Sequence, residues 1–220
     1  MEYWDSISGY SEQGLINHSE QNKTITNDLL LILNYKHFVK TSFESPIDSN
    51  SIKFLNNMIL KSKKIIEFGC GTGELLYELY NLHNKKKYLG IDITDKCINY
   101  ANEKYKNNNI SYLKFNCLNE DINKLGNFNL SICSNCLEHF KNPYILIDEM
   151  KKVSNYALIL VPYNQTPMTD GYYEEGGAGH VFKFDEDSFK NYNIISEFKF
   201  YTNGWTCGIN PLQWCVLIKF

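Results

Sequence analysis

The residues best suited to chemistry surround a glycine-rich segment that begins at Glu67 and reads Glu-Phe-Gly-Cys-Gly-Thr-Gly. A short apolar run of strand character leads into it, and leucines at helical spacing follow it. A second strand then ends in Asp92. Such a unit places backbone N–H groups and a helix N-terminus beside a ligand, with an acid at the tip of the next strand. The pattern predicts a cofactor site formed by the turn and the acid.

The spacing of the glycines indicates the class of cofactor. A dinucleotide site has the pattern G-x-G-x-x-G, whereas Gly69, Gly71 and Gly73 bring the third glycine one residue early. Glu74 stands where the dinucleotide pattern has glycine or alanine, and its carboxylate would repel a pyrophosphate. We therefore expect a cofactor that has no phosphate but carries a positive charge and a ribose. A nicotinamide-dependent oxidoreductase is the alternative, and Glu74 opposes it.

Residues 67–73 resemble motif I of the class I S-adenosylmethionine-dependent methyltransferases, written E/D-x-G-x-G-x-G. Asp92 matches the ribose-binding acid of that family, and its separation from Gly73 is close to the ~20 residues expected of such an acid. The resemblance runs from residue 65 to the C-terminus, and it implies an enzyme that uses S-adenosylmethionine and releases S-adenosylhomocysteine. It implies these cofactor-binding residues: Glu67, Gly69, Cys70, Gly71, Gly73, Asp92, Ile93, Asn116, Cys117, Leu118 and Asn135.

In this family the adenine is bound just after the third strand, where an acid and a small residue usually stand. The sequence has Asn116-Cys117-Leu118 at that point and so departs from the acid. We expect the side-chain carbonyl of Asn116 to accept a hydrogen bond from the adenine amino group. The backbone N–H of Leu118 is expected to contact the ring.

Glu138, His139 and His180 are the candidate catalytic residues. The Leu-Glu-His-Phe run that contains the first two resembles the family's signature after strand four. Methyl transfer from a sulfonium is an in-line displacement, so catalysis comes largely from positioning the acceptor and excluding water. A hydroxyl acceptor also needs a base or a metal to make it more nucleophilic. Structural roles compete with these: His139 would orient the cofactor or cap a helix, and His180 would form a loop hydrogen bond.

A divalent metal is an alternative for the same residues. Asn135, Glu138 and His139 stand at i, i+3 and i+4, so on a helix they would share one face, with His180 crossing from a loop. This resembles the E-x-x-E-H motif plus distant histidine of metal-dependent O-methyltransferases, such as the ubiquinone-pathway enzymes and the small-RNA 2′-O-methyltransferases. Those families carry a carboxylate where this chain has Asn135, and an amide oxygen is a weaker ligand for a hard cation. We favour a site without metal.

The acceptor site is expected after the fifth strand, on the carboxyl-end side of the sheet where open α/β folds bind ligands. The predicted acceptor-binding residues are Tyr163, Asn164, Tyr172, Tyr173 and His180. A loop as long as residues 165–180 is usually functional, and we expect it to fold over the acceptor as a lid. The acceptor is predicted to be a small molecule, with oxygen favoured over nitrogen as the methylated atom. A cofactor-binding protein without catalysis is the remaining alternative.

Composition limits the possible partners and the compartment. The net charge is −3 and every basic residue is lysine, so the chain has no electrostatic footprint for nucleic acid and no arginine for bidentate phosphate contacts. No signal peptide and no apolar run of membrane-spanning length is present, so we expect no membrane partner. Seven cysteines at irregular spacing indicate reduced thiols and a cytoplasmic protein. Cys133 and Cys136 form a lone C-x-x-C, which we interpret as two buried packing residues rather than a redox pair.

The elements that position these residues imply a Rossmann-like, seven-stranded α/β methyltransferase fold. The sheet is expected to be mostly parallel, with an antiparallel last strand and helices on both faces. Residues 1–60 are predicted to form an N-terminal helical cap and residues 61–220 the methyltransferase domain, in one compact unit. Predicted strands cover residues 65–68, 88–91, 110–115, 128–133, 155–161, 194–202 and 213–220. Helices are predicted at residues 28–39, 51–60, 94–106 and 185–190, after Gly73 and after Pro143.

Overall fold

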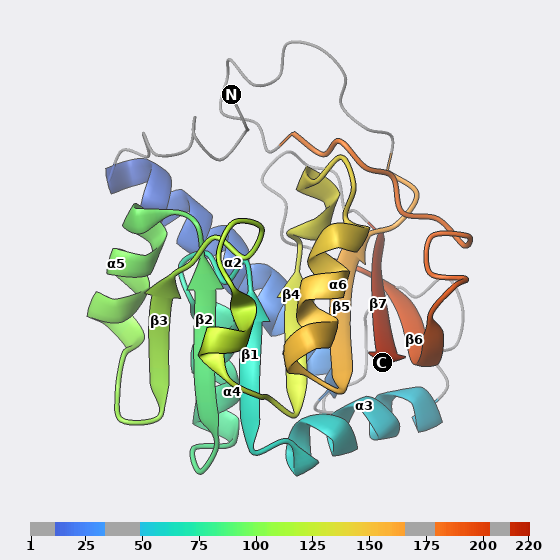
Figure 1. Ribbon diagram of the computed structural model, residues 1–220, viewed down its shortest axis with the longest axis horizontal. Coiled ribbons are helices and arrows are strands. Elements are labelled where there is room, and N and C mark those ends of the chain that lie inside the picture. Colours follow the sequence, from blue (N-terminus) through green and yellow to red (C-terminus); the bar gives the residue numbers. More distant parts are fainter. Residues whose placement is uncertain (1–11, 34–48, 166–178, 203–211) are drawn as a thin grey trace.

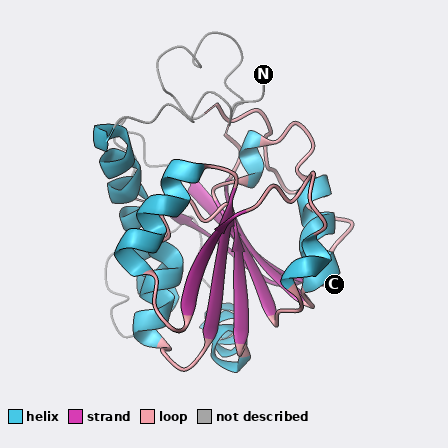
Figure 2. Cartoon of the chain, turned by 60° about the vertical axis from the view of Figure 1, so that its left-hand side comes forward, coloured by secondary structure: helices cyan, strands magenta, loops and turns pink. Residues whose placement is uncertain are grey.

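A computed structural model of the chain describes residues 12–33, 49–165, 179–202 and 212–220. A twisted sheet of seven strands forms the middle layer, and helices cover both of its faces (Figures 1 and 2). The strands are β1 Lys64–Phe68, β2 Lys87–Asp92, β3 Ile110–Lys114, β4 Leu130–Ser134, β5 Tyr156–Pro162, β6 Asn193–Tyr201 and β7 Leu212–Lys219.

The sheet has the order β3-β2-β1-β4-β5-β7-β6. The strands from β3 to β5 pair in parallel, and β7 runs antiparallel to both of its neighbours. The chain order reverses between β1 and β4, and open α/β sheets bind their ligands outside the carboxyl ends of the strands at such a point. The predicted fold, including the antiparallel last strand, is confirmed, and the structure places that strand next to the edge of the sheet.

Each face of the sheet has its own hydrophobic core. The helices are α2 Glu12–Leu33, α3 Ser49–Lys61, α4 Glu74–Leu82, α5 Asp95–Tyr105 and α6 Tyr144–Val153, with short 3-10 helices η2 Ile122–Leu125 and η3 Leu137–His139. Buried residues of α2, α3, α4 and α5 share one cluster with the sheet, and those of α6 and η2 share the other. Because both faces are covered, the central strands are apolar almost throughout rather than alternating.

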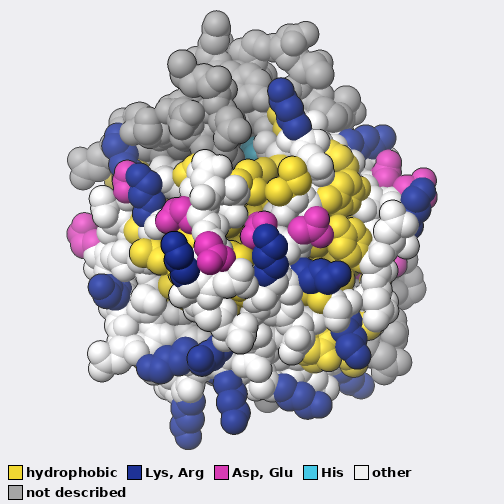
Figure 3. Space-filling model, in the orientation of Figure 1, with side chains coloured by type: hydrophobic (Ala, Val, Ile, Leu, Met, Phe, Trp, Pro, Cys, Tyr) yellow, Lys and Arg dark blue, Asp and Glu magenta, His cyan; other side chains and the backbone are white. Residues whose placement is uncertain are grey.

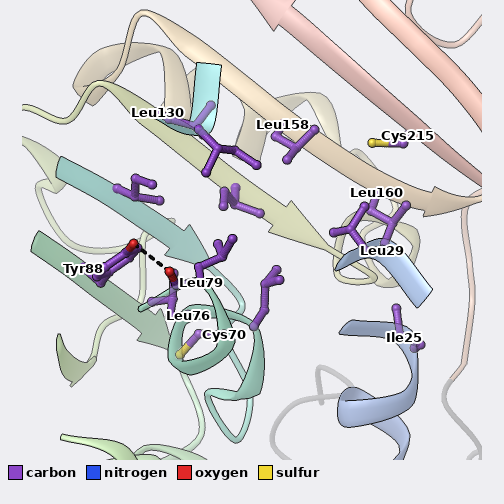
Figure 4. Close-up of a cluster of buried hydrophobic side chains, with 14 of the residues drawn as sticks. Ile25, Leu29, Cys70, Leu76, Leu79, Tyr88, Leu130, Leu158, Leu160 and Cys215 are labelled. Atoms are coloured by element: carbon purple, nitrogen blue, oxygen red, sulfur yellow. Dashed lines mark hydrogen bonds between the residues drawn. The ribbon is translucent and has the colours of Figure 1, made fainter. Parts of the chain in front are cut away.

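Helix α2 belongs to the first of these cores. Its buried Ile25 and Leu29 lie toward Leu160 of β5 and Cys215 of β7, as Figure 4 shows. In the same layer, the hydroxyl of Tyr88 donates to the carbonyl of Leu79 at 3.0 Å. Packing of this kind fixes α2 across the sheet, where it reaches the carboxyl end of β1.

Two helix predictions differ from the structure. Helix α2 begins at Glu12, well before the predicted residue 28, because the part before residue 28 docks through polar side chains such as the buried Ser19 and Thr26. A search for apolar spacing does not detect such a contact. Residues 185–190 form turns instead of a helix, since the Asp185 carboxylate accepts from the N–H of Asp187 at 3.2 Å and competes with helical bonding.

The remaining predictions about the chain's organisation have mixed outcomes. The division at residue 60 stays a prediction, and residues 1–11 and 34–48 of the proposed cap lie outside the described part. Among the described residues, the six cysteines are free thiols. No helix in that part of the chain combines the length and the apolar character that a bilayer crossing requires.

Candidate active site

The glycine-rich turn follows β1 and is shaped by close contacts. Gly69 has a φ of 68°, and a Cβ built on it would lie 2.3 Å from the sulfur of Cys136. Gly73 has a φ of 90° at the start of α4, and a Cβ there would lie 2.7 Å from the ring of Tyr112. Glycine is therefore required at both ends of the turn, for backbone conformation and for space. Gly71 and Cys70 lie between them.

Asp92 is fixed beside this turn by backbone donors. One carboxylate oxygen accepts from the N–H of Gly71 at 2.9 Å, and the other accepts from the N–H of Thr94 at 2.8 Å. A carboxylate oxygen has a second lone pair, so each oxygen can accept one more hydrogen bond. Two neighbouring hydroxyls of a ribose offer two donors at a matching separation. The position agrees with the predicted role, which awaits a binding measurement.

A mainly apolar pocket opens next to Asp92 and continues past β3. Ile93, Asn116, Cys117 and Leu118 line it, all four of which were predicted to bind the cofactor, and Gly69 forms part of its floor. Cys136, Phe140 and Leu146 close the opposite wall. A flat, largely apolar ring such as adenine fits walls of this kind.

The polar contacts predicted for the adenine differ in one respect. The side-chain oxygen of Asn116 accepts from the backbone N–H of Leu118 at 3.1 Å. The two groups expected to meet the ring therefore bond to each other in a local turn, and the Leu118 N–H already has an acceptor. The side-chain oxygen of Asn116 still has a second lone pair, which can accept a hydrogen bond from a ligand.

A second, more polar pocket lies on the other side of Gly69. It is bordered by Glu67 of β1, Cys70 of the turn, Ser134 of β4 and Asn135, which follows β4. Oε2 of Glu67 and Oδ1 of Asn135 are buried and have no hydrogen-bond partner among the described residues. Burial raises the pKa of Glu67 well above its usual value, and the nearby Glu74 and Asp92 raise it further. Buried acceptors of this kind require a donor, which the ammonium group of a bound amino-acid moiety would supply.

Glu74 has a structural task that its position in the motif does not reveal. Its carboxylate accepts from the hydroxyls of Ser19 at 2.5 Å and Thr72 at 2.6 Å, and the Tyr105 hydroxyl lies 3.4 Å away. Glu74 therefore ties α2 to the glycine-rich turn. A carboxylate at this buried position would also repel a pyrophosphate.

Sequence reasoning missed the residues of α2 that reach the site. A Cβ on Gly71 would lie 3.0 Å from Nε2 of His18 and 3.1 Å from Nδ2 of Asn22, so both side chains cover the turn. Burial lowers the pKa of His18. Asn22 donates to the hydroxyl of Thr72 at 3.1 Å. The only signal in the sequence is that Ser19, Asn22 and the next contact, Thr26, recur at helical spacing on a polar stretch.

Glu138, His139 and His180 come together after β4. One potential ligand atom from each lies within 4.8 Å of the other two, and Nε2 of His180 is 3.8 Å from Oε1 of Glu138. Nδ1 of His139 lies 3.1 Å from the Gly179 carbonyl, and Nδ1 of His180 lies 2.8 Å from the side-chain oxygen of Gln165. Since both oxygens accept, the protons are assigned to Nδ1, and each Nε2 carries a lone pair.

Burial sets the protonation of this cluster. It raises the pKa of Glu138 to about 8, and it lowers the pKa of His180 to about 4. The pKa of His139 falls to about 3, through burial first and the neighbouring His180 second. At neutral pH the two imidazoles are neutral and the Glu138 carboxyl holds its proton. Neither oxygen of Glu138 has a hydrogen-bond partner within the described part of the chain.

The local backbone differs from the helix expected at this point. Only Leu137–His139 form a single 3-10 turn, and Asn135 precedes it with a φ of 48°. The predicted shared helical face of residues 135, 138 and 139 is therefore wrong, and Asn135 borders the second pocket beside Glu67. What brings His180 to Glu138 is the main chain, because the Glu138 carbonyl accepts from the N–H groups of Val181 and Phe182 at 2.8 and 3.1 Å.

The predicted acceptor residues are only partly described. The ring of Tyr163 packs edge-on against Trp214 at 5.6 Å between centroids, and the Lys199 ammonium lies 3.5 Å from its centre. Asn164 is exposed, with a φ of 54°. Tyr172 and Tyr173 lie outside the described residues, as does most of the predicted lid.

Comparison with known proteins identifies the domain. A family model described as a methyltransferase domain matches residues 59–166. The tRNA (guanine-N(7)-)-methyltransferase of Mycoplasmopsis agalactiae is 25% identical over 145 residues, which are 64% of this chain and 64% of that protein. The matched region therefore spans less than two thirds of this relative's length.

Solved structures share the fold at low identity. The plantazolicin methyltransferase BpumL in complex with S-adenosylhomocysteine has a TM-score of 0.63 and 13% identity, covering 99% of this chain and 93% of that one. Magnesium protoporphyrin IX methyltransferase from Synechocystis PCC 6803, also with S-adenosylhomocysteine, has a TM-score of 0.58 and 12% identity, with coverages of 99% and 92%. The domain match runs from the end of α3 past β5, and the fold is the one these enzymes share, so residues 59–166 form a methyltransferase domain of the S-adenosylmethionine-dependent kind.

Proposed function

We propose that the protein transfers the methyl group of S-adenosylmethionine to a hydroxyl oxygen of a small-molecule acceptor. The observation that carries this proposal is the buried Glu138–His139–His180 cluster. It gathers two imidazole rings and a carboxyl group, and two of these, Glu138 and His139, follow closely after Asn135 and Cys136, which border the two cofactor pockets. A hydroxyl brings a proton that must leave as the oxygen becomes methylated, and this cluster can accept it.

Each part of the site has a distinct task in the proposed reaction. When bound, S-adenosylmethionine supplies an electrophilic methyl group on a positively charged sulfur. Asp92 and the glycine-rich turn hold the ribose, and the apolar pocket holds the adenine. Nε2 of His139 and of His180 position the acceptor hydroxyl, because a pKa of about 3 or 4 makes either imidazole a weak base. Glu138, once ionised, takes the hydroxyl proton.

The same cluster also fits a divalent cation. Two neutral imidazole nitrogens and a carboxylate are common ligands of divalent transition metals, and binding of a cation would displace the proton that Glu138 holds at neutral pH. Glu138, His139 and His180 would hold the ion, which would lower the pKa of an acceptor hydroxyl. Chelation separates this route from proton transfer to Glu138.

A nucleic-acid acceptor is less compatible with the chain. The relative from Mycoplasmopsis agalactiae is named for methylation of tRNA at guanine N7. This chain has net charge −3 and no arginine, so it offers no net positive charge and no bidentate arginine contact to a phosphate backbone. Among the lysines visible in Figure 3, several gather at the lower edge, where Lys64 and Lys87 begin β1 and β2, away from the site. We therefore treat tRNA as a control acceptor.

The test follows methyl-labelled S-adenosylmethionine into a panel of phenols, catechols, aliphatic alcohols and amines, with unmodified tRNA alongside. We expect label in an ether identified by mass spectrometry, and none in tRNA. Glu138→Gln removes the proton acceptor at constant size and is expected to abolish turnover while S-adenosylhomocysteine still binds. Activity that survives a chelator and rises through pH 8 supports proton transfer to Glu138. Loss in chelator and recovery with Mg²⁺, Mn²⁺ or Zn²⁺ assigns the cation.

Other outcomes would overturn the proposal. Label in an amine product would move the acceptor atom from oxygen to nitrogen, and label in tRNA would replace the substrate class. Tight S-adenosylhomocysteine binding with no turnover across the whole panel would favour a binding protein without catalysis.

A further inference from the structure

We propose that α2 recognises the amino-acid end of the cofactor, with Asn22 and Thr26 as the donors to its carboxylate. This inference rests on the proposed use of S-adenosylmethionine, and it adds binding residues that lie outside the methyltransferase motifs. It follows from how the two pockets join, from the charges that a bound cofactor would bring, and from the way α2 is held in place.

Gly69 borders both pockets, so one extended ligand lying over it would occupy the two together. The apolar pocket is on the Asp92 side and takes the nucleoside. The remainder of such a ligand, the amino-acid end, then enters the second pocket. Besides residues of β1, β4, the glycine-rich turn and α4, the boundary of that pocket includes Asn22, Ile25 and Thr26 of α2.

An amino-acid end carries an ammonium and a carboxylate, and the two groups need different hydrogen-bond partners in the pocket. Glu67, 3% exposed and with an unpartnered oxygen, is placed for the ammonium. A carboxylate needs hydrogen-bond donors, most often a cationic side chain. The chain has no arginine, and no lysine is among the described residues that border this pocket. Neutral donors must serve instead, and α2 offers the Asn22 amide and the Thr26 hydroxyl.

The Asn22 amide is already oriented toward the turn. One of its two N–H bonds donates to the Thr72 hydroxyl at 3.1 Å, which leaves the second for a ligand. Thr72 in turn donates to Glu74, and Ser19 donates to the same carboxylate. This buried chain of hydrogen bonds fixes the rotation of α2 so that residues 22 and 26 face the pocket. Preorganised donors lose less entropy on binding than mobile ones.

Two ligands separate the amino-acid end from the rest of the cofactor. S-adenosylhomocysteine has the complete amino-acid end, whereas 5′-methylthioadenosine has the same adenine, ribose and sulfur without it. Isothermal titration calorimetry of the full chain measures both. We expect Asn22→Ala to weaken S-adenosylhomocysteine binding by about 10- to 100-fold, as for a lost hydrogen bond to a charged group, and to leave 5′-methylthioadenosine within about twofold.

The matched control is Asn17→Ala, which changes the same residue type on an exposed position of α2. It is expected to bind both ligands as the unmodified chain does. Thr26→Val, which replaces the hydroxyl by a methyl of similar size, provides a second variant should Asn22→Ala unfold. Circular dichroism and the melting temperature report folding in each case.

Equal weakening of both ligands by Asn22→Ala and by Thr26→Val would overturn the inference, because it would show only that α2 supports the fold of the site. Unchanged binding of both ligands in the two variants would overturn it as well. Both of these outcomes differ from a failure of the proposed function. In both, the unmodified chain still binds S-adenosylhomocysteine. If the unmodified chain did not bind it, the proposed use of S-adenosylmethionine would be refuted.

Discussion

Replacing Asp92 by asparagine tests the centre of the cofactor site. In the folded chain its two oxygens accept from the N–H groups of Gly71 and Thr94, and the side chain is 9% exposed. Asp92→Asn keeps the size of the side chain but turns one oxygen into an NH₂ group. That group would face a backbone N–H, so two donors would meet and one buried hydrogen bond would be lost.

The magnitude follows from this geometry. An unsatisfied buried donor costs about 1–3 kcal/mol, which lowers the melting temperature of a chain of this size by roughly 2–12 °C. The ribose hydroxyls also lose a charged acceptor, which weakens S-adenosylhomocysteine binding by about 10- to 100-fold. Unlike Asn22→Ala, this change should weaken 5′-methylthioadenosine to the same degree, because both ligands contain the ribose.

Calorimetry and thermal melting together decide the outcome. Asp95→Asn is the matched control, since Asp95 is exposed at the start of the next helix and pairs with Lys114 at the surface. It should change neither the melting temperature nor the affinity by a measurable amount. Unchanged affinity in Asp92→Asn, with the melting temperature lowered, would refute the ribose assignment and leave Asp92 a purely structural residue.

Three further predictions concern the turn, the cluster and α2. Gly69→Ala should abolish S-adenosylhomocysteine binding, because the added Cβ would lie 2.3 Å from the Cys136 sulfur. Gly126 is also at positive φ but has nothing within 4 Å, so Gly126→Ala should cost only about 1 kcal/mol in unfolding free energy. Binding titrations and urea unfolding compare the two variants. Burial raises the folded-state pKa of Glu138 to about 8, so the contribution of Glu138 to the stability of the ligand-free chain should fall by up to about 2 kcal/mol between pH 6.5 and 8. The low-pKa histidines still release protons from the unfolded state in the lower part of this range, but they do so equally in Glu138→Gln. Melting of Glu138→Gln against the unmodified chain checks this, and parallel pH curves would contradict it. Ser19→Ala removes a buried hydrogen bond to Glu74 and should speed amide hydrogen exchange in α2. Lys23→Ala breaks an exposed ion pair with Glu20 and should leave the exchange rate unchanged. Equal exchange rates in the two variants would show that Ser19 does not hold the helix.

Local patterns in the sequence were sufficient to predict the strands and the cofactor half of the site. Each central strand is buried on both faces, so its residues are apolar almost throughout, and this run is visible without knowledge of its neighbours. The glycines at 69 and 73 are required by backbone conformation within the turn itself. Asp92 follows from the same unit, because a strand, a turn, a helix and a second strand place the acid beside the turn through local connectivity alone.

Contacts between distant parts of the chain decided the rest. His180 meets Glu138 because main-chain hydrogen bonds join residues 181 and 182 to residue 138, and no spacing in the sequence records that pairing. The short turn at Leu137–His139 replaced the expected helix, which separated Asn135 from the cluster. Helix α2 reached the site through Ser19 and Asn22, whose hydrogen bonds to residues 74 and 72 depend on three-dimensional proximity. Apolar periodicity reports how much surface an element buries, but polar contacts of this kind bury little apolar surface, so only the tertiary structure shows them.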